Sequence, residues 1–128
     1  PQAECVLSRD RVLAMQKLAR RVPVARSVQD YVVRALEATH PDSPSAPEVT
    51  RKYVRYGASP RGAQAALVGA KIRALCDGRF SPGFDDVRAV VPAAMRHRLI
   101  LNFEGEAEGV SPDAILAKVL EATPETGH

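Results

Sequence analysis

The chain lacks most of the sequence features by which a membrane protein or a self-contained enzyme is recognised. Its 128 residues include three tyrosines, three phenylalanines and no tryptophan, so alanine, valine and leucine must fill the core. No run approaches the ~18 consecutive apolar residues of a membrane-spanning helix, and we expect no membrane partner. Hydrophobic residues nevertheless make up 45% of the chain, which predicts one folded domain.

Cysteine and histidine are scarce and are not arranged as metal ligands. Cys5 and Cys76 lie far apart, and neither belongs to a C-x-x-C pair. This pattern is typical of free or buried thiols in a reducing cytoplasm, so a cytoplasmic location is expected. His40, His97 and His128 show no metal-ligand spacing with the cysteines, and no metal site is predicted.

Sequence motifs for independent catalysis are also missing. The chain contains no G-x-x-x-x-G-K-[ST] motif, and therefore no phosphate-binding P-loop of its own. No serine, histidine and aspartate set stands out as a triad. The segment Leu99–Glu104 resembles a strand ending in a magnesium-binding acid, but Asn102 stands where the carboxylate should be. A core strand followed by a loop is the better interpretation, and this chain alone is predicted to be inactive.

The charge is balanced and unusually rich in arginine. Eighteen Lys and Arg residues face fifteen Asp and Glu residues, which gives a net charge of +3. Only four of the basic residues are lysines, and guanidinium groups suit bidentate contacts with phosphate or carboxylate. The slight positive excess permits nucleic-acid binding without requiring it, and short basic runs such as Arg20-Arg21 are typical of solvated faces.

Apolar spacing in the first half of the chain predicts two helices and a loop. Ser8 is a suitable cap for the first helix, which Pro23 ends. A capping-box-like pair, Ser27 and Asp30, predicts the start of the second helix. Residues 40–49 contain three prolines among Ser and Asp, which predicts a loop. The inward face expected for the first helix consists of Met15, Leu18, Ala19 and Val22.

The second half predicts three further helices and at most a short strand pair. The longest helix is expected from Ser59 to Asp77, with apolar residues on two sides, so we interpret it as the central helix. The next helix begins near Phe84, is broken or kinked at Pro92 and continues to about Arg98. Residues 99–101 resemble a brief strand, residues 104–108 an acidic loop, and residues 111–113 the start of a last helix. The predicted fold class is an all-α bundle of five to six helices.

The segment Gly57–Gly62 carries the strongest functional signal. Ser59 is a preferred N-cap residue, Pro60 suits the first helical position, and Gly57 permits a sharp turn before them. Arg61 then lies in the first turn, where the helix dipole favours an anion and disfavours a cation. A phosphate group would compensate for this unfavourable placement; the alternative is an ordinary solvated arginine.

Two other charged sites have simpler interpretations. Asp85 and Asp86 form a carboxylate pair, but acids that open a helix are an ordinary capping feature. His97 lies between Arg96 and Arg98 and is a candidate for anion binding, although a packed or solvated histidine at a helix end fits the pattern better.

These motifs follow one another in an order that resembles a known family. Gly57-Ala58-Ser59-Pro60-Arg61 opens the long helix, Asp86-Val87 opens the next, and His97-Arg98-Leu99 closes it. Glu106-Ala107-Glu108-Gly109 and the final helix follow. The arrangement is similar to the C-terminal lid domain of the MoxR family of AAA+ ATPases, over about Leu7 to Thr123. The family commonly has a T-P-E-D-V-like start for the helix after the central one, where this chain has Gly83 and Phe84.

The resemblance implies a lid, residues 1–128, beside a P-loop ATPase domain that lies upstream and is absent here. It implies that Arg61 is the sensor 2 arginine, which contacts the γ-phosphate of ATP, with Ser59 as the helix cap at the same site. ATP and magnesium are then cofactors of the full-length protein, not of this part alone. The family also implies a hexameric ring, von Willebrand A-domain partners and chaperone-like maturation of protein complexes.

Two other classes of function remain open from the residues alone. A helical protein-interaction domain is one alternative, with the acidic residues 104–108 and the final helix as its docking surface. A DNA-binding helical module is the other, but the positive charge is scattered and no helix has an evident recognition face. The client of the parent protein does not follow from this sequence.

Overall fold

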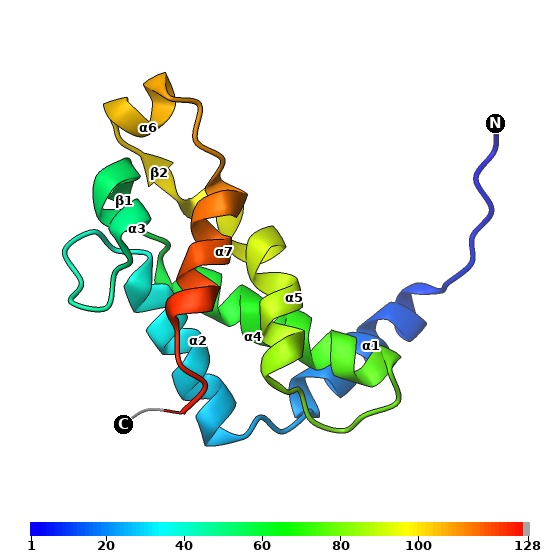
Figure 1. The fold of residues 1–128 in the computed structure, drawn as a ribbon. Coiled ribbons are helices and arrows are strands. Elements are labelled where there is room, and N and C mark those ends of the chain that lie inside the picture. The colour runs from blue at the N-terminus through cyan, green and yellow to red at the C-terminus, as the bar shows by residue number, and fades with distance from the viewer. Residues whose placement is uncertain (127–128) are drawn as a thin grey trace.

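The computed structural model describes residues 1–126, and its elements are almost all helical (Figure 1). In chain order the described residues form α1 (Arg9–Arg21), α2 (Arg26–Ala38), α3 (Glu48–Tyr53), β1 (Val54–Tyr56), α4 (Pro60–Cys76), α5 (Phe84–Met95), the 3-10 turn η1 (Arg96–Arg98), β2 (Ile100–Leu101), α6 (Phe103–Ala107) and α7 (Pro112–Ala122). Strands β1 and β2 pair antiparallel, with Val54 opposite Leu101. The predicted fold class, a helical bundle with a short strand pair, is confirmed.

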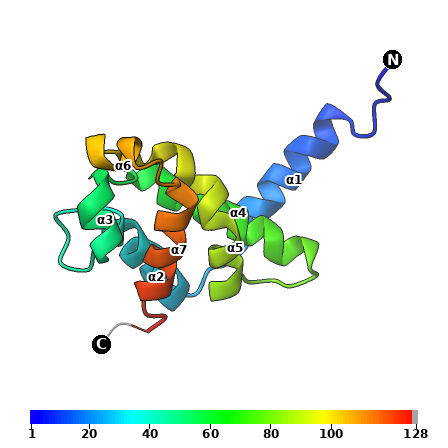
Figure 2. The ribbon, with the colours of Figure 1, turned by 45° about the horizontal axis from the view of Figure 1, so that its top comes forward.

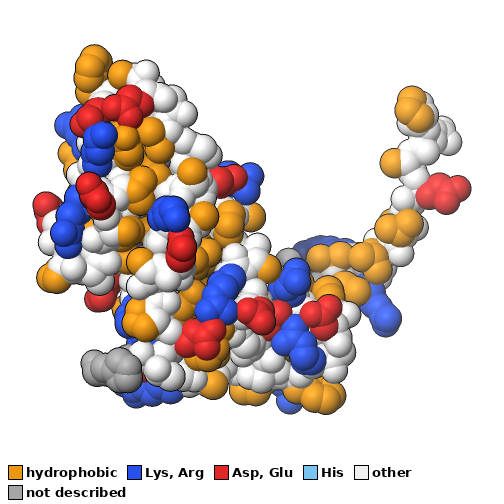
Figure 3. Space-filling model, in the orientation of Figure 1, with side chains coloured by type: hydrophobic (Ala, Val, Ile, Leu, Met, Phe, Trp, Pro, Cys, Tyr) orange, Lys and Arg blue, Asp and Glu red, His pale blue; other side chains and the backbone are white. Residues whose placement is uncertain are grey.

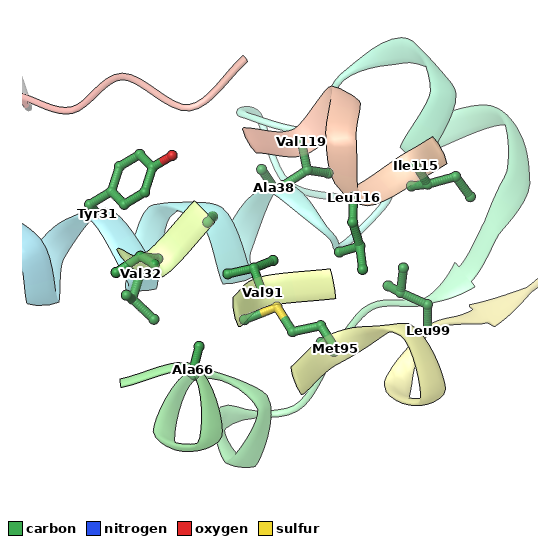
Figure 4. Close-up of a cluster of buried hydrophobic side chains, with 14 of the residues drawn as sticks. Tyr31, Val32, Ala38, Ala66, Val91, Met95, Leu99, Ile115, Leu116 and Val119 are labelled. Carbon is green, nitrogen blue, oxygen red and sulfur yellow. The ribbon is translucent and has the colours of Figure 1, made fainter. Parts of the chain in front are cut away.

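Helices α2, α4, α5 and α7 enclose the core (Figure 4). Small residues of α4 face inward, among them Ala66 and Ala70, which are both fully buried. Close packing of α4 on α5 follows, because a Cβ at Gly69 would lie only 3.2 Å from Cβ of Val90. Larger side chains fill the remaining space, and Tyr31 meets Phe84 edge on with ring centroids 5.3 Å apart. Because most core side chains are small and few are aromatic, the helices pack close together.

Two short helices occupy segments in which the sequence predicted none. The predicted loop of residues 40–49 ends earlier than expected, because α3 begins at Glu48. The predicted acidic loop is wrong in its conformation: it forms α6, since the Asn102 side chain accepts a hydrogen bond of 2.9 Å from the Gly105 amide and caps the helix. Its acids are partly paired, because Lys52 lies 3.5 Å from Glu104.

The predicted start of the second helix is two residues late. Helix α2 begins at Arg26, and Ala25 takes the cap position without a side-chain cap. The Ala25 carbonyl accepts hydrogen bonds from the amides of Val28 and Gln29, so the backbone closes the first turn before Ser27 is reached. The expected Ser27–Asp30 capping box does not form.

Helix α5 does not break at Pro92. It runs to Met95 with Pro92 inside, and the Arg96 amide donates to the Pro92 carbonyl beyond it. The turn η1 then continues to Arg98, the residue near which the sequence predicts the end of the helix. A break at Pro92 is therefore wrong, and a kink there stays a prediction. The expected end near Arg98 holds for α5 and η1 taken together.

Helix α1 begins and ends as predicted but does not bury the expected face. The Ser8 hydroxyl accepts a hydrogen bond of 3.2 Å from the Arg11 amide, which caps the helix. Ala19 and Val22 are buried, but Met15 is 49% and Leu18 is 55% exposed. Helix α1 projects away from the bundle and packs mainly against α4 (Figure 2). In the described residues, no helix is both long and apolar enough to span a membrane.

Candidate functional site

The start of α4 has the backbone geometry that the sequence predicts. Ser59 is the N-cap residue in an extended conformation, and Pro60 takes the first helical position. The Ser59 side chain makes no capping hydrogen bond, however. Its carbonyl instead accepts a bond of 2.7 Å from the Gly62 amide. The predicted cap position is therefore confirmed, and the predicted capping role of the hydroxyl is not.

The residues before α4 are held against the end of α2. The Ala58 amide donates to the Thr39 hydroxyl at 3.0 Å, and that hydroxyl donates to the Leu36 carbonyl at 2.6 Å. The Ala58 carbonyl lies 2.9 Å from Nε2 of His40, and since a carbonyl only accepts, Nε2 must carry the proton. Both backbone groups of Ala58 are thus fixed by one short segment.

Gly57 is required by the same contact. A Cβ at this position would lie 2.7 Å from both the Thr39 carbonyl oxygen and Cγ of His40. From the sequence alone, Gly57 is explained by turn geometry, and its close approach to the end of α2 is not predictable. His40 falls in the predicted loop, and no local pattern links it to Ala58, eighteen positions away.

Arg61 projects from this fixed start into solvent. It is exposed, and the first turn of α4 contains no acidic residue. Among residues 1–126, no carboxylate or carbonyl pairs with its guanidinium. A permanently charged side chain therefore stands at the positive end of a 17-residue helix, and residues 1–126 supply no counter-ion for it.

A second basic segment packs against the same turn. Cδ of Arg98 approaches within 3.3 Å of the Cβ position of Gly62, so Gly62 leaves space for η1. The Arg98 guanidinium donates a bond of 2.7 Å to the Ala94 carbonyl and lies against the His97 ring. His97 itself is exposed at the helix end, a position that both of its interpretations allow. The structure thus brings the H-R-L segment beside the start of α4.

The carboxylate pair serves the start of α5. The Asp86 side chain is buried, accepts a bond of 2.8 Å from the Gly83 amide and binds both terminal nitrogens of Arg79 at 2.7 Å. These bonds, led by that from Arg79, lower the pKa of Asp86 below its ordinary value despite burial. Asp85 pairs with Arg88 on the surface. The capping interpretation is confirmed, and Gly83 rather than threonine holds the cap position.

The remaining candidate groups do not form a site. Cys5 and Cys76 are both free, and both are exposed, so the alternative of buried thiols is excluded. Within the described part of the chain, no group of three or more His, Cys, Asp or Glu residues is placed to hold a metal ion.

The fold is a helical bundle around a long, alanine-rich helix whose second residue is an exposed arginine. The AAA lid domain family matches residues 47–119. The chain is 33% identical to Chaperone MoxR1 of Mycobacterium tuberculosis over 136 aligned positions, which cover all of this chain and 36% of that protein. It is 35% identical to Protein MoxR of Methylorubrum extorquens over 104 positions, or 77% of this chain and 30% of that protein.

A solved structure has a similar fold. The crystal structure of a candidate ATPase from Cytophaga hutchinsonii superposes with a TM-score of 0.86 and 30% identity, covering 92% of this chain and 36% of that one. The chain therefore belongs to the AAA lid domain family, as a lid of the MoxR type. It spans about a third of the length of the relatives that it matches.

Proposed function

We propose that this chain works as the lid of a longer ATPase and that Arg61 is its sensor 2 residue. In this proposal the P-loop domain lies upstream, binds ATP with magnesium and presents the γ-phosphate to Arg61. The observation that carries the proposal is an exposed, unpaired guanidinium at the N-terminus of α4. The guanidinium is planar and always charged, so it can donate two parallel hydrogen bonds to phosphoryl oxygens.

The contacts around Ala58 suit this role. A residue that senses phosphate must be held by a rigid support if its movement is to be passed on to the domain. Thr39 and His40 both bind Ala58, which lies three residues before Arg61. The turn η1 packs on Gly62, the residue after Arg61. Loss of the γ-phosphate would release Arg61, and the whole bundle would move with α4. Ser59 belongs to the same site through its place at the helix start.

The wider function follows from the same proposal. A ring of six subunits would allow Arg61 to act within its own subunit or on a neighbour. One relative is named a chaperone, which supports a chaperone-like role. The wider proposal is maturation of protein complexes in the cytoplasm, with a von Willebrand A-domain protein as a partner. Lid movement driven by ATP hydrolysis would supply the mechanical step.

Substitution of Arg61 in the longer protein tests the proposal. Arg61→Ala should lower the rate of ATP hydrolysis about 10²- to 10³-fold, the usual cost of removing one preorganised charge donor from a transition state. Arg61→Lys should recover only part of the rate, because an ammonium group cannot make the planar bidentate contact of a guanidinium. Phosphate release by each purified variant is the measurement.

Arg55→Ala is the matched control, since Arg55 is another exposed arginine and stacks only on Tyr56. Its hydrolysis rate should equal that of the unsubstituted protein. An Arg61→Ala variant that is folded and hydrolyses ATP at the normal rate would overturn the role proposed for Arg61.

A further inference from the structure

The position of Arg61 depends on the backbone that precedes it. Figure 3 shows Lys and Arg side chains beside Asp and Glu side chains over much of one face of the molecule. Arg73 and Arg79, for example, share one carboxylate. Among residues 1–126, by contrast, no carboxylate or carbonyl holds the Arg61 guanidinium, and the Ser59 hydroxyl makes no capping bond. The described residues therefore lack the local side-chain contacts that would fix Arg61.

Two side chains at the end of α2 hold Ala58 instead. The Thr39 hydroxyl accepts a hydrogen bond of 3.0 Å from the Ala58 amide and donates one of 2.6 Å to the Leu36 carbonyl. Nε2 of His40 donates to the Ala58 carbonyl at 2.9 Å. We call the bonds of Thr39 and His40 to Ala58 the Ala58 clamp, because together they tie both backbone groups of this residue to the end of α2.

The Ala58 clamp is buried and is connected to Arg61 by a short, stiff link. Thr39 and Ala58 are both 0% exposed, so water does not replace a hydrogen bond that is lost between them. Only Ser59 and Pro60 separate Ala58 from Arg61, and the proline ring restricts the backbone of this link. A displacement of Ala58 would therefore reach Arg61 directly.

We propose that Thr39 and His40 are positioning residues for ATP hydrolysis, which act through Ala58 to hold Arg61 toward the transferred phosphate. The inference rests on the proposed function and adds to it two residues that act on the backbone. A charge donor stabilises the transition state only when it is held in place, and a displacement of about 1 Å costs much of the rate. Loss of the Ala58 clamp should therefore lower kcat, whereas KM for ATP, set mainly by the P-loop domain, should change little.

Thr39→Val in the longer protein removes the hydroxyl and keeps the shape of the side chain. We expect kcat for ATP hydrolysis to fall about 10-fold, with KM for ATP changed less than about twofold. Thr39→Ser keeps the hydroxyl and should restore most of the rate. Thr50→Val is the matched control, because Thr50 is also 0% exposed but its hydroxyl has no hydrogen-bond partner among residues 1–126. Its rate should equal that of the unsubstituted protein.

His40→Ala tests the Ala58 clamp from the surface, since His40 is exposed and its removal leaves the core intact. We expect kcat to fall about threefold, as for the loss of one hydrogen bond. His40→Gln supplies an amide donor near the place of Nε2 and should restore the rate. This pair of variants decides the question if Thr39→Val does not fold.

A double-mutant cycle with Arg61→Ala separates positioning from general destabilisation. If Thr39 and His40 act through Arg61, then Thr39→Val or His40→Ala should change the rate of the Arg61→Ala protein less than about twofold. An equal fall with and without Arg61, or no fall when Arg61 is present, would overturn the positioning role and leave the sensor role standing. Normal turnover of the Arg61→Ala protein would instead overturn the proposed function, and the positioning role with it.

Discussion

Gly57 shows how a single residue without a side chain determines the position of Arg61. The residue lies where the backbone before α4 passes the end of α2, within contact distance of the Thr39 carbonyl. Ala58 then uses both of its backbone groups to bind Thr39 and His40. The start of α4, and with it Arg61, is therefore fixed relative to α2 and not only to its own helix.

Gly57→Ala should destabilise the chain. The new Cβ would lie 2.7 Å from a backbone oxygen, and because that oxygen belongs to the backbone of α2, the two segments must separate. We expect a loss of about 1–3 kcal/mol in the free energy of unfolding, typical of overpacking. Urea denaturation followed by circular dichroism measures the change.

Gly83→Ala is the control for this prediction. A Cβ at Gly83 would meet nothing closer than Asp86 Oδ2 at 4.0 Å, and Gly83 has a negative φ. Its effect should stay within about 1 kcal/mol, the range for a cap substitution. Equal stability of the Gly57→Ala and unsubstituted chains would contradict the close contact.

At this scale the sequence predicted local features well. Ser59, Pro60 and Arg61 form the expected helix start because capping chemistry depends on neighbouring residues. The contact of His40 with Ala58 was missed, since it joins residues brought together only by tertiary folding. The capping hydroxyl of Ser59 was wrongly predicted, because a backbone carbonyl supplied the hydrogen bond instead.

Helix α5 illustrates how one buried acid organises an element. Asp86 satisfies the Gly83 amide at the start of α5 and binds Arg79, which follows the end of α4. Arg73 of α4 lies 3.4 Å from the same carboxylate. The acid thus joins the start of α5 to the last turn of α4 and to the connection between them.

This network predicts a dependence of stability on pH. The pKa of Asp86 is lower in the folded chain than in the unfolded one, so the unfolded chain binds protons first. The contribution of Asp86 is therefore fully present above its ordinary pKa of about 4 and is lost as the pH falls below it. Urea denaturation between pH 7 and pH 2.5 should show this loss.

Asp86→Asn should lower the free energy of unfolding at pH 7 by about 2 kcal/mol, the typical value of hydrogen bonds to a charged group. The variant should also lose less stability than the unsubstituted chain when the pH falls below 4. Asp85→Asn is the control, because Asp85 is exposed and should change neither quantity appreciably. Parallel pH profiles for the Asp86→Asn and unsubstituted chains would contradict the account.

Elements were predicted where periodicity is long and were missed where it is short. Helix α4 and the last helix follow from their caps and apolar spacing. Helix α3 and α6 have six and five residues, too few for a pattern to appear. Periodicity gave α1 an apolar face but could not show that this face lies outside the core, since that depends on what packs against it.

The two ends of α4 carry different surface features. Arg61 lies at its first turn, beside η1, whereas Ile72, Leu75 and Cys76 near its last turns line an apolar groove with α1. A rigid central helix thus connects the proposed phosphate contact to the face that packs against α1. The core of α2, α4, α5 and α7 makes this connection stiff, because closely packed interiors transmit displacement.

At this scale the sequence predicted the class of fold and its family. The order of the short motifs was informative because each marks a helix boundary in the same bundle. The packing of the H-R-L segment on Gly62 was not predictable, since it needs α4 and α5 to be placed in space.

The most direct test is a structure of the longer protein with a non-hydrolysable ATP analogue and magnesium bound. Our account predicts that the Arg61 guanidinium donates hydrogen bonds of about 2.7–2.9 Å to oxygens of the terminal phosphate, in its own subunit or in a neighbour. Arg61 left in solvent in every subunit, with another cation on that phosphate, would contradict the central claim.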